Sequence, residues 1–188
     1  MSSIYKLLNV MRSLREPETG CPWEVKQDFH SVAPYTVEEA YEVADAIERN
    51  DMENLRDELG DLLFQVIFHA QMAEEVGLFD FDDVAGGITD KLIRRHPHVF
   101  GSDEERAAGQ QDGSWEQIKA TERSAADDGS AMAGVAKALP ALKRAEKLGQ
   151  RASRVGFDWP DRQGVRDKIN EELDELSVAV GSREVDEM

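Results

Sequence analysis

Five acidic residues in the first half of the chain have types and spacing that suit metal binding. Glu38, Glu39 and Glu42 lie in one predicted helix, and Glu58 and Asp61 lie in the next. Glu39 and Glu42 are three residues apart and therefore share one helix face, and the same spacing joins the second pair. Each helix thus presents two carboxylates on one side.

The two acidic pairs lie symmetrically about a predicted turn near Asn50. Counted from that residue, Glu42 and Glu58 are each eight positions away. Glu39 and Asp61 are each eleven positions away. Residues equally far from the turn of an antiparallel helix pair lie at the same level, so four carboxylates can converge at one level of the hairpin.

Such a cluster needs a counter-charge. Left unpaired beside the apolar run L-G-D-L-L-F-Q-V-I-F, the carboxylates would repel one another and would be costly to desolvate. A hard divalent cation removes both problems, and all-oxygen ligation favours Mg²⁺, with Mn²⁺ as the alternative. The competing interpretation is a solvated acidic face that forms surface ion pairs with Arg49 and Arg56.

The elements that would position these residues are helical throughout. The sequence predicts an all-α fold, an antiparallel helical bundle with the metal site on a helix hairpin. The hairpin spans residues 36–76, with a capping box of Thr36 and Glu39 at its start and Gly77 at its end. Segment 15–34 contains three prolines and is expected to be an ordered loop with at most one helical turn.

Apolar periodicity also predicts helices outside the hairpin. They cover residues 2–15, 82–95, 114–123, 138–157 and 162–180. In the helix over 82–95 we expect Val84, Ile88 and Leu92 to face inward, and the His96–Pro97 step to end the helix. The polar run 101–113 is expected to be a loop.

Composition limits the partners of the chain. Its 188 residues carry a formal net charge of −17, which argues against nucleic acid and anionic membranes as partners. The single cysteine, Cys21, suits a reducing compartment, and the sequence has no apolar stretch of membrane-spanning length. We therefore expect a cytoplasmic protein that binds neither nucleic acid nor a membrane.

The acidic motif of the hairpin recurs near the end of the sequence. Glu171, Glu172 and Glu175 repeat its E-E-x-x-E spacing, and Trp159 precedes them as Trp23 precedes the first copy. No second helix with E-x-x-D follows this later copy. The sequence thus predicts a complete domain over 1–123, a linker over 124–134 and the first half of a second copy over 135–188, the alternative being a plain acidic helix.

Five motifs, in order, resemble the MazG family. They are G-C-P-W-E at 20–24, E-E-A-Y-E-V at 38–43, E-L-G-D-L-L at 58–63, K-L-I-R-R-H-P-H-V-F at 91–100 and W-E-Q-I-K at 115–119. MazG proteins are nucleoside triphosphate pyrophosphohydrolases of the all-α superfamily that includes the dimeric dUTPases. The resemblance covers residues 1–123, and residues 135–188 resemble the first half of the second copy found in two-copy members.

The resemblance implies a hydrolase that acts on acid anhydrides, and a homodimer in which the helical bundle with its metal site is completed by dimerisation. Its reaction would convert a nucleoside triphosphate to the monophosphate and pyrophosphate with Mg²⁺. Carried over position by position, the metal ligands would be Glu39, Glu42, Glu58 and Asp61. Glu38 would orient or deprotonate the attacking water, or support the ligands from behind.

Basic and aromatic residues after the hairpin are the candidates for holding the nucleotide. Lys91 and Arg95 are four residues apart on one helix face and are candidates to clamp the phosphate chain. Trp115 and Lys119 resemble the family's nucleotide-contacting pair. The competing interpretations are ion pairs with nearby acidic residues for Lys91 and Arg95, and a core position for Trp115.

One departure from the family pattern leaves a second function open. Nucleotide-binding copies often carry a lysine one turn before E-E-x-x-E, where this chain has Tyr35 in the first copy and Lys168 in the second. A catalytically weak helical regulator that binds nucleotide or protein is therefore the alternative to an enzyme. A narrower hydrolase of modified or deoxy nucleotides also stays open. A di-iron protein is disfavoured because no histidine lies three residues after Glu39 or Glu58.

Overall fold

The protein is described by a computed structural model that covers residues 2–109 and 130–182. The chain divides into two compact units, residues 1–111 and 112–188, and each is described by itself. The described residues form helices and no strand, so the expected all-α fold is confirmed. Among the described helices, none is both long and apolar enough to cross a membrane.

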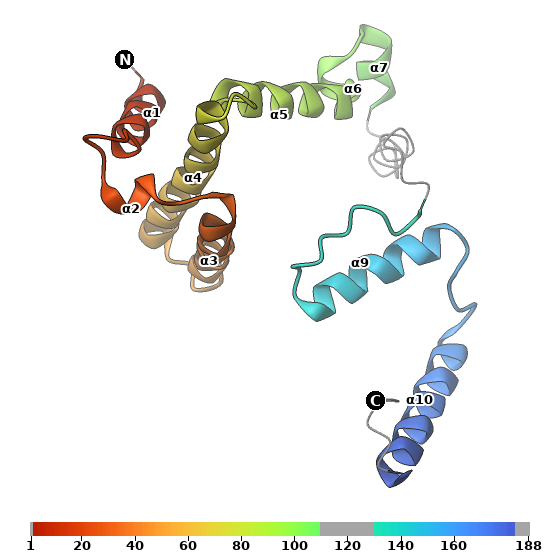
Figure 1. The fold of residues 1–188 in the computed structure, drawn as a ribbon. Coiled ribbons are helices and arrows are strands. Elements are labelled where there is room, and N and C mark those ends of the chain that lie inside the picture. Colours follow the sequence, from red (N-terminus) through yellow and green to blue (C-terminus); the bar gives the residue numbers. More distant parts are fainter. Residues whose placement is uncertain (1, 110–129, 183–188) are drawn as a thin grey trace. The chain divides into compact units, whose positions relative to one another are not determined.

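The first unit is built around an antiparallel helix hairpin (Figure 1). Its helices are α1 (Ser3–Leu14), α2 (Pro22–Val25), α3 (Phe29–Glu48), α4 (Met52–Glu75), α5 (Phe81–Arg95), α6 (Pro97–Phe100) and α7 (Asp103–Ala108). Helices α3 and α4 form the hairpin, and α1 packs against α4. The core cluster consists of Met11, Val32, Ile67, Phe68 and Met72.

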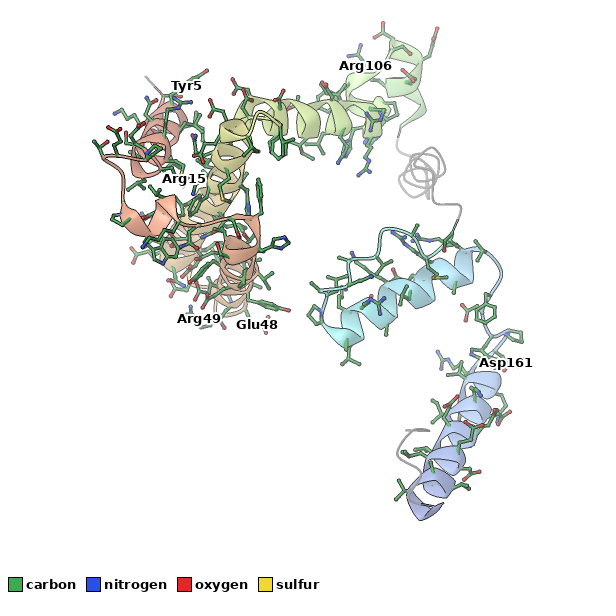
Figure 2. All side chains as sticks on the ribbon, viewed as in Figure 1. Tyr5, Arg15, Glu48, Arg49, Arg106 and Asp161 are labelled. Atoms are coloured by element: carbon green, nitrogen blue, oxygen red, sulfur yellow. The ribbon has the colours of Figure 1, made fainter. Side chains whose placement is uncertain are left out.

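The turn of the hairpin lies where the sequence predicts it. Figure 2 shows Glu48 and Arg49 at the end of α3, and Asn50 follows with a φ of 55°, in the left-handed region. The backbone N–H of Asp51 donates to the carbonyl of Ala46 at 3.0 Å, which closes the last turn of α3. Asp51 then caps α4 by accepting from the N–H of Asn54.

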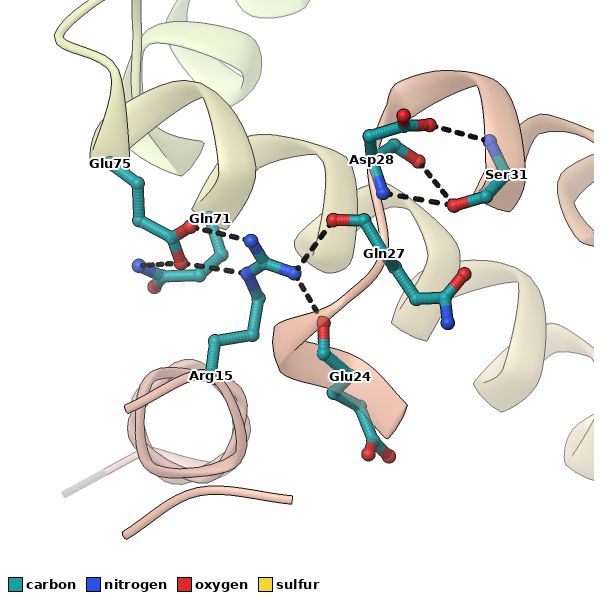
Figure 3. A network of polar contacts seen from close by, with 7 residues as sticks. All are labelled: Arg15, Glu24, Gln27, Asp28, Ser31, Gln71 and Glu75. Carbon is teal, nitrogen blue, oxygen red and sulfur yellow. Dashed lines mark hydrogen bonds and ion pairs between the residues drawn. The ribbon is translucent and has the colours of Figure 1, made fainter. Parts of the chain in front are cut away.

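Helix α3 begins seven residues before the predicted start of the hairpin, at Phe29 rather than Thr36. Its N-terminal capping box is formed by Asp28 and Ser31 (Figure 3). Pro34 lies inside the helix, where it removes one backbone donor. The predicted capping box of Thr36 and Glu39 is therefore wrong, because Thr36 is within the helix.

The segment after α4 differs from expectation in two ways. Gly77 ends α4 as predicted, with a φ of 70°. The predicted loop over 101–113 is wrong in its described part, because Ser102 and Glu105 form a capping box that starts α7. The prediction that Ile88 and Leu92 on α5 face inward is also wrong within this unit, since the two residues are 47% and 42% exposed.

The second unit contains two described helices, α9 (Ala141–Arg154) and α10 (Arg162–Ser182), as the sequence predicts. Lys168 on α10 forms ion pairs with Glu171 and Glu172 at 2.6 and 3.0 Å. The expected helix over 114–123 lies outside the described residues, as does most of the predicted linker 124–134. The domain limits 1–123 and 135–188 stay predictions.

Candidate active site

The hairpin brings three of the predicted ligands together. Glu39 on α3 and Glu58 and Asp61 on α4 each offer a carboxylate oxygen, and these three oxygens lie within 4.8 Å of one another. Glu39 and Glu58 are partly buried, while Asp61 is exposed. We refer to these three residues as the acidic cluster. Its oxygens come from both helices, which is the arrangement that the mirror spacing about Asn50 implies.

The carboxylates of the acidic cluster lie close enough to repel one another. The pKa of Glu39 is raised by burial and by the charges of Asp61 and Glu42. The pKa of Glu58 is raised by partial desolvation and by the charges of Glu42 and Asp61, against a hydrogen bond from Asn54 that lowers it. Glu39 and Glu58 are thus harder to ionise, because burial and the like charges of their neighbours both disfavour the charged form.

The remaining two acidic candidates stand at the edge of the cluster. Glu42 is exposed, but its carboxyl group interacts with both Glu39 and Glu58. Glu38 is exposed and lies outside the group of oxygens that approach within 4.8 Å. The structure therefore brings Glu42 to the cluster and leaves Glu38 beside it on α3.

A polar layer lies on the same side of the hairpin, and sequence reasoning missed it. Gln65 is 6% exposed, and its Oε1 lacks a hydrogen-bond partner among the described residues. It is four residues after Asp61, so it shares the α4 face of the cluster. Its polarity within an apolar run was the available signal. Beyond it, the Thr36 hydroxyl lies 3.0 Å from Nε2 of His69.

Arg15 ties the segment before α3 to the hairpin (Figure 3). Its guanidinium donates to both carboxylate oxygens of Glu75, at 2.7 and 2.6 Å, and to the backbone carbonyls of Glu24 and Gln27. It also lies over the ring of Phe68, 5.4 Å from its centroid. We call this set of contacts the Arg15 clasp. It fixes the end of α1, α2 and the start of α3 on α4.

The phosphate-binding candidates lie on a different element from the cluster. Lys91 is exposed and Arg95 is partly buried, and both belong to α5, which leads away from the hairpin (Figure 1). The structure does not bring them to the acidic cluster of the same chain. Trp115 and Lys119 lie outside the described residues.

Comparisons with known proteins identify the family. A family model described as the MazG nucleotide pyrophosphohydrolase domain matches residues 27–100, which include the whole acidic hairpin. A nucleoside triphosphate pyrophosphohydrolase of Escherichia coli K12 is 50% identical over 187 residues, covering 100% of this chain and 71% of that protein. This chain therefore belongs to the MazG family of nucleotide pyrophosphohydrolases, and the expected family and enzyme class are confirmed.

Two proteins of Thermotoga maritima are also similar. A nucleoside triphosphate pyrophosphohydrolase/pyrophosphatase MazG is 44% identical over 182 residues, covering 97% of this chain and 69% of that protein. The crystal structure of a mazG-related protein matches 62% of this chain and 98% of its own, with 29% identity and a TM-score of 0.47.

Proposed function

We propose that this MazG-family chain hydrolyses nucleoside triphosphates to the monophosphate and pyrophosphate with Mg²⁺ held by the acidic cluster. One water is consumed, and one P–O–P bond of the triphosphate is broken. The observation that carries the proposal is the convergence of three carboxylate oxygens within 4.8 Å across the two helices of the hairpin. Family membership and the E. coli relative supply the reaction class.

The donor set fits a hard divalent cation. Glu39, Glu58 and Asp61 are all oxygen donors, and Glu42 stands close enough to serve as a fourth. Their mutual repulsion makes a dication a favourable occupant, and oxygen-only ligation suits Mg²⁺, with Mn²⁺ as a substitute. A bound Mg²⁺ supplies positive charge that stabilises the negative charge developing on the phosphate oxygens.

The other residues act on water and substrate in this proposal. Glu38 lies next to Glu39 on α3 and is exposed, so a water near the cluster can be oriented or deprotonated by it. Lys91 and Arg95, which lie away from the cluster of their own chain, donate to the phosphate chain within the proposed homodimer, and Trp115 and Lys119 contact the nucleotide. We also propose a homodimer and a cytoplasmic location, where the single Cys21 stays reduced.

The first test is turnover of a panel of nucleoside triphosphates with and without Mg²⁺, resolving pyrophosphate from orthophosphate. We expect pyrophosphate, lost on addition of EDTA. Glu58→Gln should lower turnover by at least about 100-fold, because it removes one charged ligand without changing shape. The matched control is Asp57→Asn, an exposed neighbour that pairs with Arg56 and should keep wild-type turnover.

A stability measurement checks the same ligands without turnover. Mg²⁺ should raise the melting temperature of the wild-type protein and of Asp57→Asn, because a ligand that binds only the folded state stabilises it. Glu58→Gln should lose most of this increase. Full turnover in Glu58→Gln, or an equal Mg²⁺ effect in all three proteins, would contradict the assignment of the cluster.

Tyr35 favours a second candidate function, a regulator that binds nucleotide without turning it over. Tyr35 occupies the place of the family's lysine and packs edge-on against Trp23, with ring centroids 5.8 Å apart. The side chain there is thus held in an aromatic pair rather than offering a positive charge. Nucleotide binding with no pyrophosphate release from any substrate in the panel would support this candidate.

A further inference from the structure

Gln65 is a buried polar residue in the middle of α4. It is 6% exposed, and its Oε1 has no hydrogen-bond partner among the described residues. A buried carbonyl oxygen without a donor is costly, so nearly all such groups in folded proteins are satisfied. The two other members of the polar layer, Thr36 and His69, are engaged with one another at 3.0 Å. Gln65 therefore presents an acceptor for which the described residues supply no donor.

The helix period directs this acceptor toward the acidic cluster. At 100° per residue, Gln65 lies about 20° from the direction of Glu58 and about 40° from that of Asp61, so it falls between the two carboxylates of α4. Its Cα is about 6 Å further along the helix than that of Asp61. Helical side chains lean toward the N-terminus, over the preceding turn, and the turn before Gln65 is the one that carries Asp61. The Gln65 amide thus extends toward the inner side of the cluster.

The chemistry of the proposed ion indicates which donor this acceptor would meet. Mg²⁺ requires octahedral coordination and usually keeps several of its waters, and three or four carboxylates do not fill that shell. A water bound to a cation directs its lone pair at the metal, so it has two hydrogens to donate. An amide carbonyl is a neutral acceptor for such a water and adds no further charge to the cluster. A bulky nucleotide group fits this place poorly, because Gln65 is 6% exposed.

We propose that Gln65 is a positioning residue of the metal centre. Its Oε1 accepts a hydrogen bond from a water of the Mg²⁺ that the acidic cluster holds. The unpaired acceptor is a cost to the metal-free protein, and that cost disappears when the ion is bound, so Gln65 favours the occupied site. The inference rests on the proposed function and adds a residue that fixes the hydrated ion without touching it.

The test is Gln65→Met, which keeps the length of the side chain and removes the acceptor. Without Mg²⁺ this variant should be at least as resistant to denaturant as wild type, because an apolar group replaces an unpaired buried oxygen. Its dissociation constant for Mg²⁺, measured by titration calorimetry with no nucleotide present, should rise about 10-fold. A glutamine that only supports the fold would give the reverse pattern, namely lower stability without Mg²⁺ and unchanged Mg²⁺ affinity.

Two further variants show whether the effect belongs to the acceptor. Gln65→Glu keeps an oxygen in the same place and adds a negative charge beside the cluster. It should bind Mg²⁺ at least as tightly as wild type, while its stability without Mg²⁺ falls through repulsion. The matched control is Gln71→Met on the same helix, where the amide donates to Oε1 of Glu75 at 3.3 Å. Its Mg²⁺ affinity should equal that of wild type.

The outcomes separate this inference from the proposed function. Wild-type Mg²⁺ affinity in Gln65→Met, with helicity retained by circular dichroism, would overturn the inference and leave the acidic cluster as the metal site. An equal loss of affinity in Gln71→Met would overturn it too, because the effect would then not depend on the place beside the cluster. A wild-type protein that binds no Mg²⁺ would remove the proposed function, and the role of Gln65 with it.

Discussion

At the scale of residues, the site places carboxylates where their charges are unfavourable without a cation. Burial and neighbouring charge both raise the pKa of Glu39 and of Glu58, and the hairpin tolerates this because the apolar core lies elsewhere, around Ile67 and Phe68. A site arranged in this way gives up stability in order to bind a ligand. His69 belongs to the polar layer beside the acidic cluster, and its titration can be measured through protein stability.

His69 should make stability fall at acidic pH. Burial lowers the pKa of its imidazole, and its Nε2 interacts with the Thr36 hydroxyl. A folded-state pKa below the unfolded value means that protons bind the unfolded chain more tightly. The stabilising contribution is then fully present above the ordinary histidine pKa and is lost as pH falls from there through the lowered pKa of the folded state.

The measurement is the free energy of unfolding of wild type and His69→Gln between about pH 7.5 and pH 5.5. Glutamine places an amide near the position of Nε2 and does not titrate in this range. We expect the wild-type value to drop relative to that of the variant as pH falls. Parallel curves for the two proteins would show that His69 titrates equally in both states.

At the scale of elements, the hairpin was predictable because residue spacing along the chain is enough to determine its geometry. Positions counted from Asn50 fix which carboxylates share a level, and only the helix period is needed to assign their faces. The turn itself has a left-handed residue at Asn50. The local chemistry of the chain thus specifies the hairpin and the cluster together.

Replacement of Asn50 tests this turn. Asn50→Ala should cost on the order of 1 kcal/mol in the free energy of unfolding, because a side chain with a Cβ and no local hydrogen bond is strained at positive φ. Asn50→Gly should be close to neutral, since glycine adopts that conformation freely. Denaturant unfolding of the two variants gives the comparison, and equal losses would contradict the conformational explanation.

The start of α3 was not predictable in the same way. Pro34 suggests a helix boundary, yet the reciprocal hydrogen bonds of Asp28 and Ser31 start the helix at Phe29, five residues before the proline. Pro34 therefore lies inside the helix. The Arg15 clasp holds this segment on α4 through contacts between residues about 60 positions apart. Contacts of such sequence separation leave no periodic signal, so a single sequence does not reveal them.

The Arg15 clasp should matter far more than the ion pair next to it. The Arg15 side chain is 8% exposed and makes four polar contacts, so Arg15→Met should cost on the order of 2 kcal/mol. Arg12 pairs with Glu74 on the same two helices, but the side chains are 56% and 43% exposed. Arg12→Met should cost less than about 1 kcal/mol. Equal effects in thermal or denaturant unfolding would contradict the structural role of the clasp.

At the scale of the whole molecule, the chain has 22 lysines and arginines against 39 acidic residues, and its net charge is −17. Periodicity shows that α5 has an apolar face, but it does not show what covers that face. The expectation that Ile88 and Leu92 face inward fails within one unit for this reason, since both are about half exposed. If a second copy covers them, the same pattern is satisfied in the assembly.

The last prediction separates assembly from folding. Ile88→Glu places a charge on the exposed apolar face of α5 formed by Val84, Ile88 and Leu92, where burial against another copy would leave it unpaired. We expect this variant to be monomeric by light scattering at concentrations where wild type is dimeric, and to lose turnover, while its helicity is unchanged. Leu142→Glu on α9 is the matched control, because Leu142 is already 88% exposed and its replacement should leave both properties intact. A dimeric, active Ile88→Glu protein would mean that this face of α5 does not form the interface of the proposed homodimer.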